Sequence, residues 1–334
     1  MSGSGFGLKW LWMLLTTLAL LPSVVISALP ELQLTGLKTE SPEAKGDWSR
    51  IVIPLKRAGN LILIEARIDS LYGNFILDTG APYLVLNQTY FRSYETSTKT
   101  ASVGLNGTST ATRTNIPKLD LGILFYEDVE ADIVNLRQIE DQKKIQVFGL
   151  LGTNLFTGLL VQIDLVLNQM ILYRLNATGE VIFESDSLSA DTLFRIANPD
   201  MRLTFKLCDD KIFVPVEIGG QKMNWILDTG AETNVVDAWS KKKVIKEFVV
   251  SRRINLVGST GEKQEILLGV MPQTHVGEEV FPMQQTIVTS MQELSETCSL
   301  YIDGILGYSF LSQGVFTINF VKKEFSMYLY NASK

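Results

Sequence analysis

The chain contains 334 residues, 46% hydrophobic and 20% charged, a globular composition long enough for two domains. Its net charge of −6 and its lack of a large Lys/Arg cluster argue against nucleic-acid binding. The single histidine, His275, excludes a His-rich zinc site, and no Gly-x-Ser-x-Gly motif or nearby reactive cysteine accompanies it for a Ser-His-Asp or Cys-His centre. The sequence implies no metal and no organic cofactor.

The N-terminus is typical of an export signal. Lys9 precedes the apolar run Trp10–Leu21, Pro22 interrupts it, and small residues up to Ala28 offer a cleavage site. We expect a signal peptide at 1–28, a polar lead-in at 29–47 and a periplasmic or secreted protein. The alternative is an uncleaved membrane anchor, although the run is short for a span.

The first half then predicts short strands separated by turns. Strands are expected at Ile51–Leu55 and Leu61–Ile68, and Phe75-Ile76-Leu77 leads into Asp78-Thr79-Gly80-Ala81. A Gly-apolar-apolar-Gly segment, Gly149–Gly152, follows, with strands near Val161–Leu165 and Gln169–Tyr173.

The second half repeats this order. A strand at Ile212–Ile218 precedes Trp225-Ile226-Leu227 and Asp228-Thr229-Gly230-Ala231. Gly304–Gly307 matches the earlier glycine segment, and strands follow near Phe316–Phe320 and Phe325–Tyr330. Helical periodicity is weak, apart from a turn or two near Asp237–Phe248 and after each glycine segment.

The repeat indicates an internal duplication. The hexapeptide Ile-Leu-Asp-Thr-Gly-Ala occurs at Ile76–Ala81 and Ile226–Ala231, 150 residues apart, and the glycine segments lie 155 residues apart. We predict an all-β protein of two similar lobes, 48–178 and 200–334, joined by a linker at 179–199. Cys208 and Cys298 both lie in the second lobe, where an exported chain could join them as one disulfide.

Two Asp-Thr-Gly-Ala motifs in this setting resemble the retropepsin-like and pepsin-like aspartic proteases. The resemblance covers about residues 48–178 and 200–332. It implies two β-barrel lobes with the active site at their interface, and an aspartic endopeptidase in which Asp78 and Asp228 are catalytic. Retroviral relatives usually build this site from two subunits, whereas here both motifs lie in one chain, so we expect a monomer with pseudo-twofold lobes.

The motif also has a chemical reading of its own. Two facing carboxylates cannot both ionise easily, so they hold one proton between them and titrate as a unit. The ionised member can act as general base on water, and the protonated member can donate to a substrate carbonyl.

The resemblance assigns roles to the neighbouring residues. Gly80 and Gly230 would let backbone N–H groups approach the carboxylates. Thr79 and Thr229 would cross-link the two acidic loops through side-chain hydrogen bonds.

Two further glycine pairs are expected at hairpin tips. The first tip holds Gly104, Asn106 and Gly107, and the second holds Gly258, Ser259 and Gly261. By resemblance these are flaps that bind and cover a peptide; the alternative is ordinary surface hairpins.

The halves differ directly after the motif. Glu232 follows the second motif, where relatives often place an acidic residue that binds substrate backbone, whereas Pro82 follows the first. We therefore expect unequal subsites, with the alternative that Glu232 is a salt-bridged loop residue.

The expected partner is a peptide or protein substrate, with no nucleic acid and no membrane contact beyond an N-terminal anchor. Two rival hypotheses stay open. One is a non-catalytic peptide-binding protein of the same fold, and the other is pairing of each half with its twin in a second chain.

Overall fold

A computed structural model describes residues 41–94, 98–104, 107–182, 198–208, 210–257, 263–296 and 300–330. The expected signal peptide, residues 29–40 of the lead-in and most of the linker lie outside these residues. No helix among those described is both long and apolar enough to cross a bilayer.

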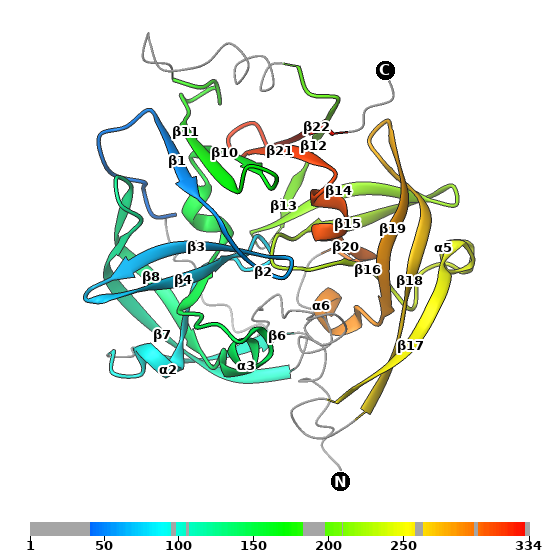
Figure 1. The fold of residues 1–334 in the computed structure, drawn as a ribbon, viewed down its shortest axis with the longest axis horizontal. Coiled ribbons are helices and arrows are strands. Elements are labelled where there is room, and N and C mark those ends of the chain that lie inside the picture. Colours follow the sequence, from blue (N-terminus) through cyan, green and yellow to red (C-terminus); the bar gives the residue numbers. More distant parts are fainter. Residues whose placement is uncertain are drawn as a thin grey trace.

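Each half of the chain forms an eight-stranded sheet, and both sheets have the same strand order (Figure 1). The first, in spatial order, contains β2 (Lys56–Ala58), β3 (Leu61–Ile68), β4 (Leu71–Leu77), β9 (Gly149–Leu151), β5 (Leu84–Asn87), β8 (Phe125–Val134), β7 (Gly107–Asp120) and β6 (Thr98–Gly104). The second contains β13 (Lys206–Cys208), β14 (Lys211–Ile218), β15 (Gln221–Leu227), β20 (Gly304–Leu306), β16 (Asn234–Asp237), β19 (Glu279–Thr289), β18 (Lys263–Val276) and β17 (Val249–Val257). The prediction of an all-β fold with two similar lobes is confirmed.

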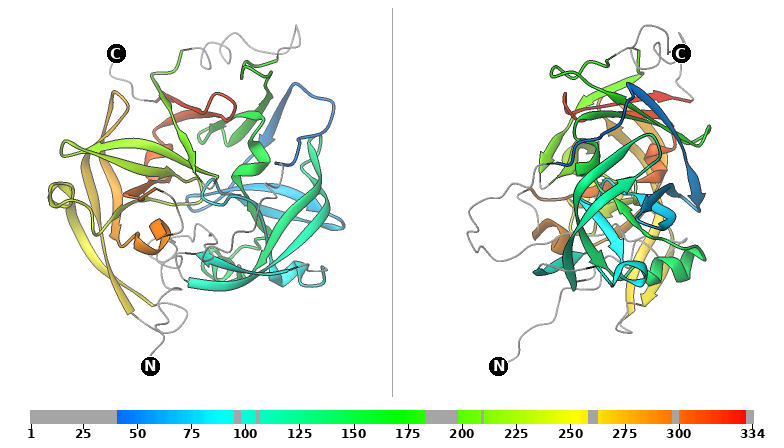
Figure 2. Two further views of the ribbon diagram at one scale, coloured as in Figure 1. Left: turned by 180° about the vertical axis from the view of Figure 1, so that it is seen from behind. Right: turned by 90° about the vertical axis from the view of Figure 1, so that its left-hand side faces the viewer.

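A third sheet joins the lobes. Its six strands, in spatial order, are β1 (Arg50–Pro54), β11 (Gln169–Arg174), β10 (Leu159–Asp164), β21 (Gly314–Asn319), β22 (Glu324–Leu329) and β12 (Met201–Thr204). Strands β10 and β21 come from different halves and pair antiparallel from Leu160↔Asn319 to Ile163↔Phe316. Figure 2 shows this sheet from two further sides.

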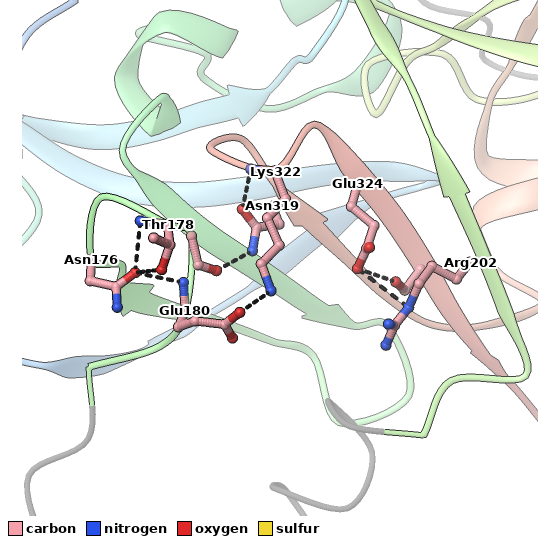
Figure 3. Close-up of polar contacts among 9 residues, drawn as sticks. Asn176, Thr178, Glu180, Arg202, Asn319, Lys322 and Glu324 are labelled. Atoms are coloured by element: carbon pink, nitrogen blue, oxygen red, sulfur yellow. Dashed lines mark hydrogen bonds and ion pairs between the residues drawn. The ribbon is translucent and has the colours of Figure 1, made fainter.

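Polar contacts beside the third sheet also connect the halves (Figure 3). The Asn319 amide donates to the carbonyl oxygen of Gly179 at 2.8 Å, and Lys322 pairs with Glu180 at 2.7 Å. Residues 179 and 180, expected at the start of a linker, are therefore held against the β21–β22 hairpin.

The helices are short and lie at the ends of strands. They are α2 (Gln88–Phe91), α3 (Arg137–Lys143), the 3-10 helix η1 (Thr153–Phe156), α5 (Lys242–Glu247), α6 (Gln292–Glu296) and α7 (Tyr308–Leu311). The turns expected after each glycine segment are η1 and α7, and α5 lies within the predicted 237–248 region.

The apolar core follows the alternation of the strands. In β14, Ile212, Val214, Val216 and Ile218 point into the main core, while Phe213 lies on the opposite face in a second cluster. Strand β3 repeats this, with Ile62, Ile64, Ala66 and Ile68 on the core face and Leu61 and Leu63 on the other.

Candidate active site

The two acidic loops meet between the lobes. Asp78 directly follows β4 and Asp228 directly follows β15, and their side chains are 0% and 1% exposed. The N–H of Asp78 donates to the Leu151 carbonyl at 3.0 Å, and the N–H of Asp228 donates to Leu306 at 3.0 Å. The duplicated sequence thus places both carboxylates in matching backbone frames.

Reciprocal hydrogen bonds of two threonines join these loops. The backbone N–H of Thr79 donates to Oγ1 of Thr229, and that of Thr229 donates to Oγ1 of Thr79, both at 3.0 Å. Each hydroxyl then donates across the interface, from Thr79 to the Leu227 carbonyl at 2.9 Å and from Thr229 to Leu77 at 2.8 Å. The cross-link fixes the relative position of the two aspartates.

The motif glycines lie against the opposite carboxylates. A Cβ atom on Gly80 would lie 2.8 Å from Oδ2 of Asp228, and one on Gly230 would lie 2.7 Å from Cγ of Asp78. Their N–H groups donate to Oδ1 of the preceding aspartate, at 2.9 Å in the first loop and 2.8 Å in the second. Any larger residue at either position would push the two carboxylates apart.

The electrostatics of the pair favour one retained proton. Burial, followed by the negative charge of Asp228, raises the pKa of Asp78 well above its ordinary value. Within the described part of the chain, Oδ2 of Asp78 is buried and has no hydrogen-bond partner. This oxygen is therefore available to a water or substrate atom.

The Gly-apolar-apolar-Gly segments pass close behind the acidic loops. A Cβ atom on Gly152 would lie 2.2 Å from the Tyr83 carbonyl oxygen, and one on Gly307 would lie 2.4 Å from that of Thr233. The following residues bind the motif loops, since Thr153 and Tyr308 donate their N–H groups to Ala81 and Ala231 at 2.9 and 2.8 Å. Glycine is required here for close approach of two backbones.

Hairpins are present where flaps are expected. Strands β6 and β7 pair up to Gly104↔Gly107, and β17 and β18 pair up to Val257↔Lys263. Asn106 at the first tip and Gly258, Ser259 and Gly261 at the second lie outside the described residues.

The side chain of Glu232, expected to contact substrate, is occupied by an ion pair. It is 3% exposed and contacts Nζ of Lys143, at the end of α3 in the other lobe. Asn60 donates its side-chain amide to the Glu232 carbonyl oxygen at 3.0 Å, so a third residue holds this loop across the interface. Burial raises the pKa of Glu232 to about 7 and lowers that of Lys143. The geometry matches the alternative reading of a salt-bridged loop residue.

Several interface residues were missed by sequence reasoning. Besides Lys143 and Asn60, these include Arg57 of the first lobe. Its guanidinium carbon lies 4.6 Å from the ring centre of Tyr308 in the second lobe. Lys211 begins β14 and is 1% exposed. Lys211 stands directly before the predicted strand Ile212–Ile218 and after two aspartates, so nothing in the sequence marks it as buried, and nothing connects Lys143 to Glu232. No cluster of three or more metal-ligating side chains occurs among the described residues.

The chain was then compared with known proteins. The family model described as "Aspartyl protease" matches residues 64–155 and 214–310, more than half of the chain. The two matched ranges contain the two acidic motifs and the two glycine segments. A search of the curated proteins gave no match.

Solved structures with similar folds were found at low identity. An aspartic proteinase from Irpex lacteus is 12% identical, with a TM-score of 0.48, over 85% of this chain and 99% of that one. The protein edgp is 10% identical, with a TM-score of 0.43, over 84% and 95%. A retropepsin-like aspartic protease from Rickettsia conorii is 19% identical, with a TM-score of 0.27, over 41% and 97%.

Proposed function

Because the chain belongs to the aspartyl protease family, we propose that it is an aspartic endopeptidase that hydrolyses peptide bonds with water activated between Asp78 and Asp228. The observation that supports this most directly is the pair of buried acidic loops cross-linked by Thr79 and Thr229. The substrate is a peptide or protein, and no residue of the site calls for a metal or cofactor.

The chemistry requires one proton on the pair. The ionised carboxylate takes a proton from water while the water oxygen attacks the carbonyl carbon, and the protonated carboxyl donates to the carbonyl oxygen. The proton on the pair then passes to the amide nitrogen and the C–N bond breaks, while one hydroxyl of the diol intermediate returns its proton to the ionised carboxylate, which leaves the pair with one proton again. Fixed carboxylate positions contribute to catalysis because the pair needs little rearrangement in the transition state.

Single and double substitutions of the dyad test the proposal. We expect Asp78→Asn and Asp228→Asn each to abolish cleavage of a mixed peptide library, and the double variant to be little worse than either. The wild type should show a bell-shaped pH–rate profile with its optimum below pH 7. A metal chelator should not change its activity. Near-full activity in one single variant would contradict an intramolecular dyad.

The same library separates the rival function. A non-catalytic peptide-binding protein would bind peptides, detected by fluorescence anisotropy, without cleaving any at any pH. Cleavage by the wild type that is lost in either aspartate variant would exclude that rival.

We also propose that the protein is exported. The support is the signal-like segment at 1–28 with its apolar run Trp10–Leu21. N-terminal sequencing of the mature protein tests this, since a start near residue 29 is expected and an intact Met1 would indicate a retained anchor.

A further inference from the structure

A buried lysine begins β14 where the other lobe has a leucine. Lys211 is 1% exposed and Leu61 is 0% exposed. Their positions match in the strand ladders, because Lys211 pairs with Cys208 of β13 as Leu61 pairs with Ala58 of β2. The 150-residue offset of the acidic motifs also relates Lys211 to Leu61.

The ammonium group of Lys211 lacks a hydrogen-bond partner within the described part of the chain. Among the described residues, no hydrogen-bond acceptor reaches its Nζ atom, which is buried. A buried ammonium without a partner is strongly unfavourable, and it becomes favourable only when an anion or several acceptors approach it.

The lysine lies on the strand face that is turned towards the acidic loop. Lys211 shares a face of β14 with Phe213, which belongs to a cluster containing Ala231 of the second motif and Ile226. Leu61 lies on the corresponding face of β3 together with Leu63. Both belong to a cluster that also contains Leu268 and Ile287 of the other lobe. Leu61 therefore belongs to an apolar cluster that reaches across the interface.

The corresponding residues on the Lys211 side are charged. The ladders place Arg113 opposite Asp132 in the first lobe as they place Leu268 opposite Ile287 in the second. Arg113 binds the Asp132 carboxylate through two contacts at 3.0 and 3.1 Å, so Asp132 already has a cation. The pseudo-twofold thus relates the apolar Leu268–Ile287 pair to the charged Arg113–Asp132 pair, and Leu61 to Lys211.

The residue that the pseudo-twofold relates to Glu232 carries no carboxylate. In the first lobe, the turn before Leu61 contacts the residue after the second motif, because Asn60 donates to the Glu232 carbonyl oxygen. The pseudo-twofold therefore relates the start of β14 to the residue after the first motif, as the start of β3 is related to Glu232. That residue is Pro82, which has no carboxylate.

We propose that Lys211 is a specificity-determining residue that binds an acidic side chain of the peptide substrate on the Pro82 side of the dyad. The lysine is as buried as Asp78 and Asp228, and it shares a strand face with Phe213, whose cluster includes Ala231 of the second motif. The inference rests on the proposed peptidase function and names its substrate class.

Matched peptides that differ only by Glu or Gln test this on the wild-type enzyme. With Glu scanned along both sides of the scissile bond, we expect one position at which kcat/KM is about 30-fold higher for Glu than for Gln. Lys211→Met should reduce that ratio to near 1, whereas Lys211→Arg should keep most of it. The matched control, Leu61→Met, should keep the ratio. A wild type without any Glu preference, or a preference that survives in Lys211→Met, would overturn the inference.

Binding to an Asp78→Asn variant separates this inference from the peptidase function. Glu-preferring binding that Lys211→Met removes, together with a wild type that cleaves nothing, would sustain the role of Lys211 and refute the enzyme. Cleavage without a Glu preference would sustain the peptidase function and refute the role of Lys211. Absence of both binding and cleavage would overturn both.

Discussion

At the scale of single residues, the Glu232–Lys143 pair makes the interface between the lobes asymmetric, because Pro82 stands at the matching position of the first motif. Both side chains are 3% exposed, and they come from different lobes. Glu232→Ala would leave a buried ammonium without its partner, so we expect a loss of about 3 kcal/mol in the free energy of unfolding. Adding Lys143→Met to Glu232→Ala should recover most of that loss, as measured by urea denaturation. Equal stabilities of the wild type and Glu232→Ala would show that the pair is not buried in solution.

The same glutamate gives the stability a defined pH dependence. Its pKa is raised from 4.5 to about 7 in the folded state. Between these values the folded chain holds a proton on Glu232 that the unfolded chain releases, so the contribution of Glu232 to stability is greatest below pH 4.5 and falls as pH rises to about 7. We expect Glu232→Gln, which cannot ionise, to flatten the dependence of the unfolding free energy on pH. The change that it removes across this window is at most roughly 3 kcal/mol. The pKa of Asp78 is also raised, but Asp78 is present in both the wild type and Glu232→Gln. It therefore does not contribute to the difference between their pH dependences.

An unchanged slope in Glu232→Gln would contradict a raised pKa at this residue. Lys143 acts in the opposite direction, because burial lowers its pKa. The measurement is urea denaturation at a series of pH values below 7.

At the scale of elements, the glycine segments are defined by backbone proximity. Gly152→Ala would place Cβ 2.2 Å from the Tyr83 carbonyl oxygen, which cannot move without shifting the loop after the first motif. We expect a loss of about 2 kcal/mol or more in the free energy of unfolding, with reduced peptidase activity. Gly158→Ala is the control, because no atom lies within 4 Å of its Cβ position and its φ is not left-handed. Similar thermal melts for both variants would mean that the two backbones are not this close.

The sequence predicted these elements better than it predicted their contacts. Strands β3 and β14, both motifs and the turns after each glycine segment follow from local alternation and duplication. Helices α2, α3 and α6 were missed because they are short and flanked by strands. Lys143 and Glu232 are 89 residues apart, and their contact depends on how the lobes pack. The pattern could predict the acidic pair because its two members share one local sequence, which the ion pair does not.

At the scale of the whole molecule, both carboxylates come from one chain whose halves share a sheet. The β10–β21 ladder, the Asn319–Gly179 hydrogen bond and the threonine cross-link all join the lobes within that chain. A complete site should therefore not require a second copy. This arrangement favours an intramolecular dyad over pairing of each half with its twin.

Dilution and mixing test that arrangement. We expect activity per chain to stay constant on dilution from about 1 µM to 1 nM, a range over which weakly associated subunits separate. Asp78→Asn and Asp228→Asn chains, mixed after joint unfolding and refolding, should recover no activity, because no chain then holds both carboxylates. Exchange of halves between chains would instead assemble one intact pair and restore part of the activity. Recovery in the mixture, or a fall in activity per chain on dilution, would assign the dyad to two chains.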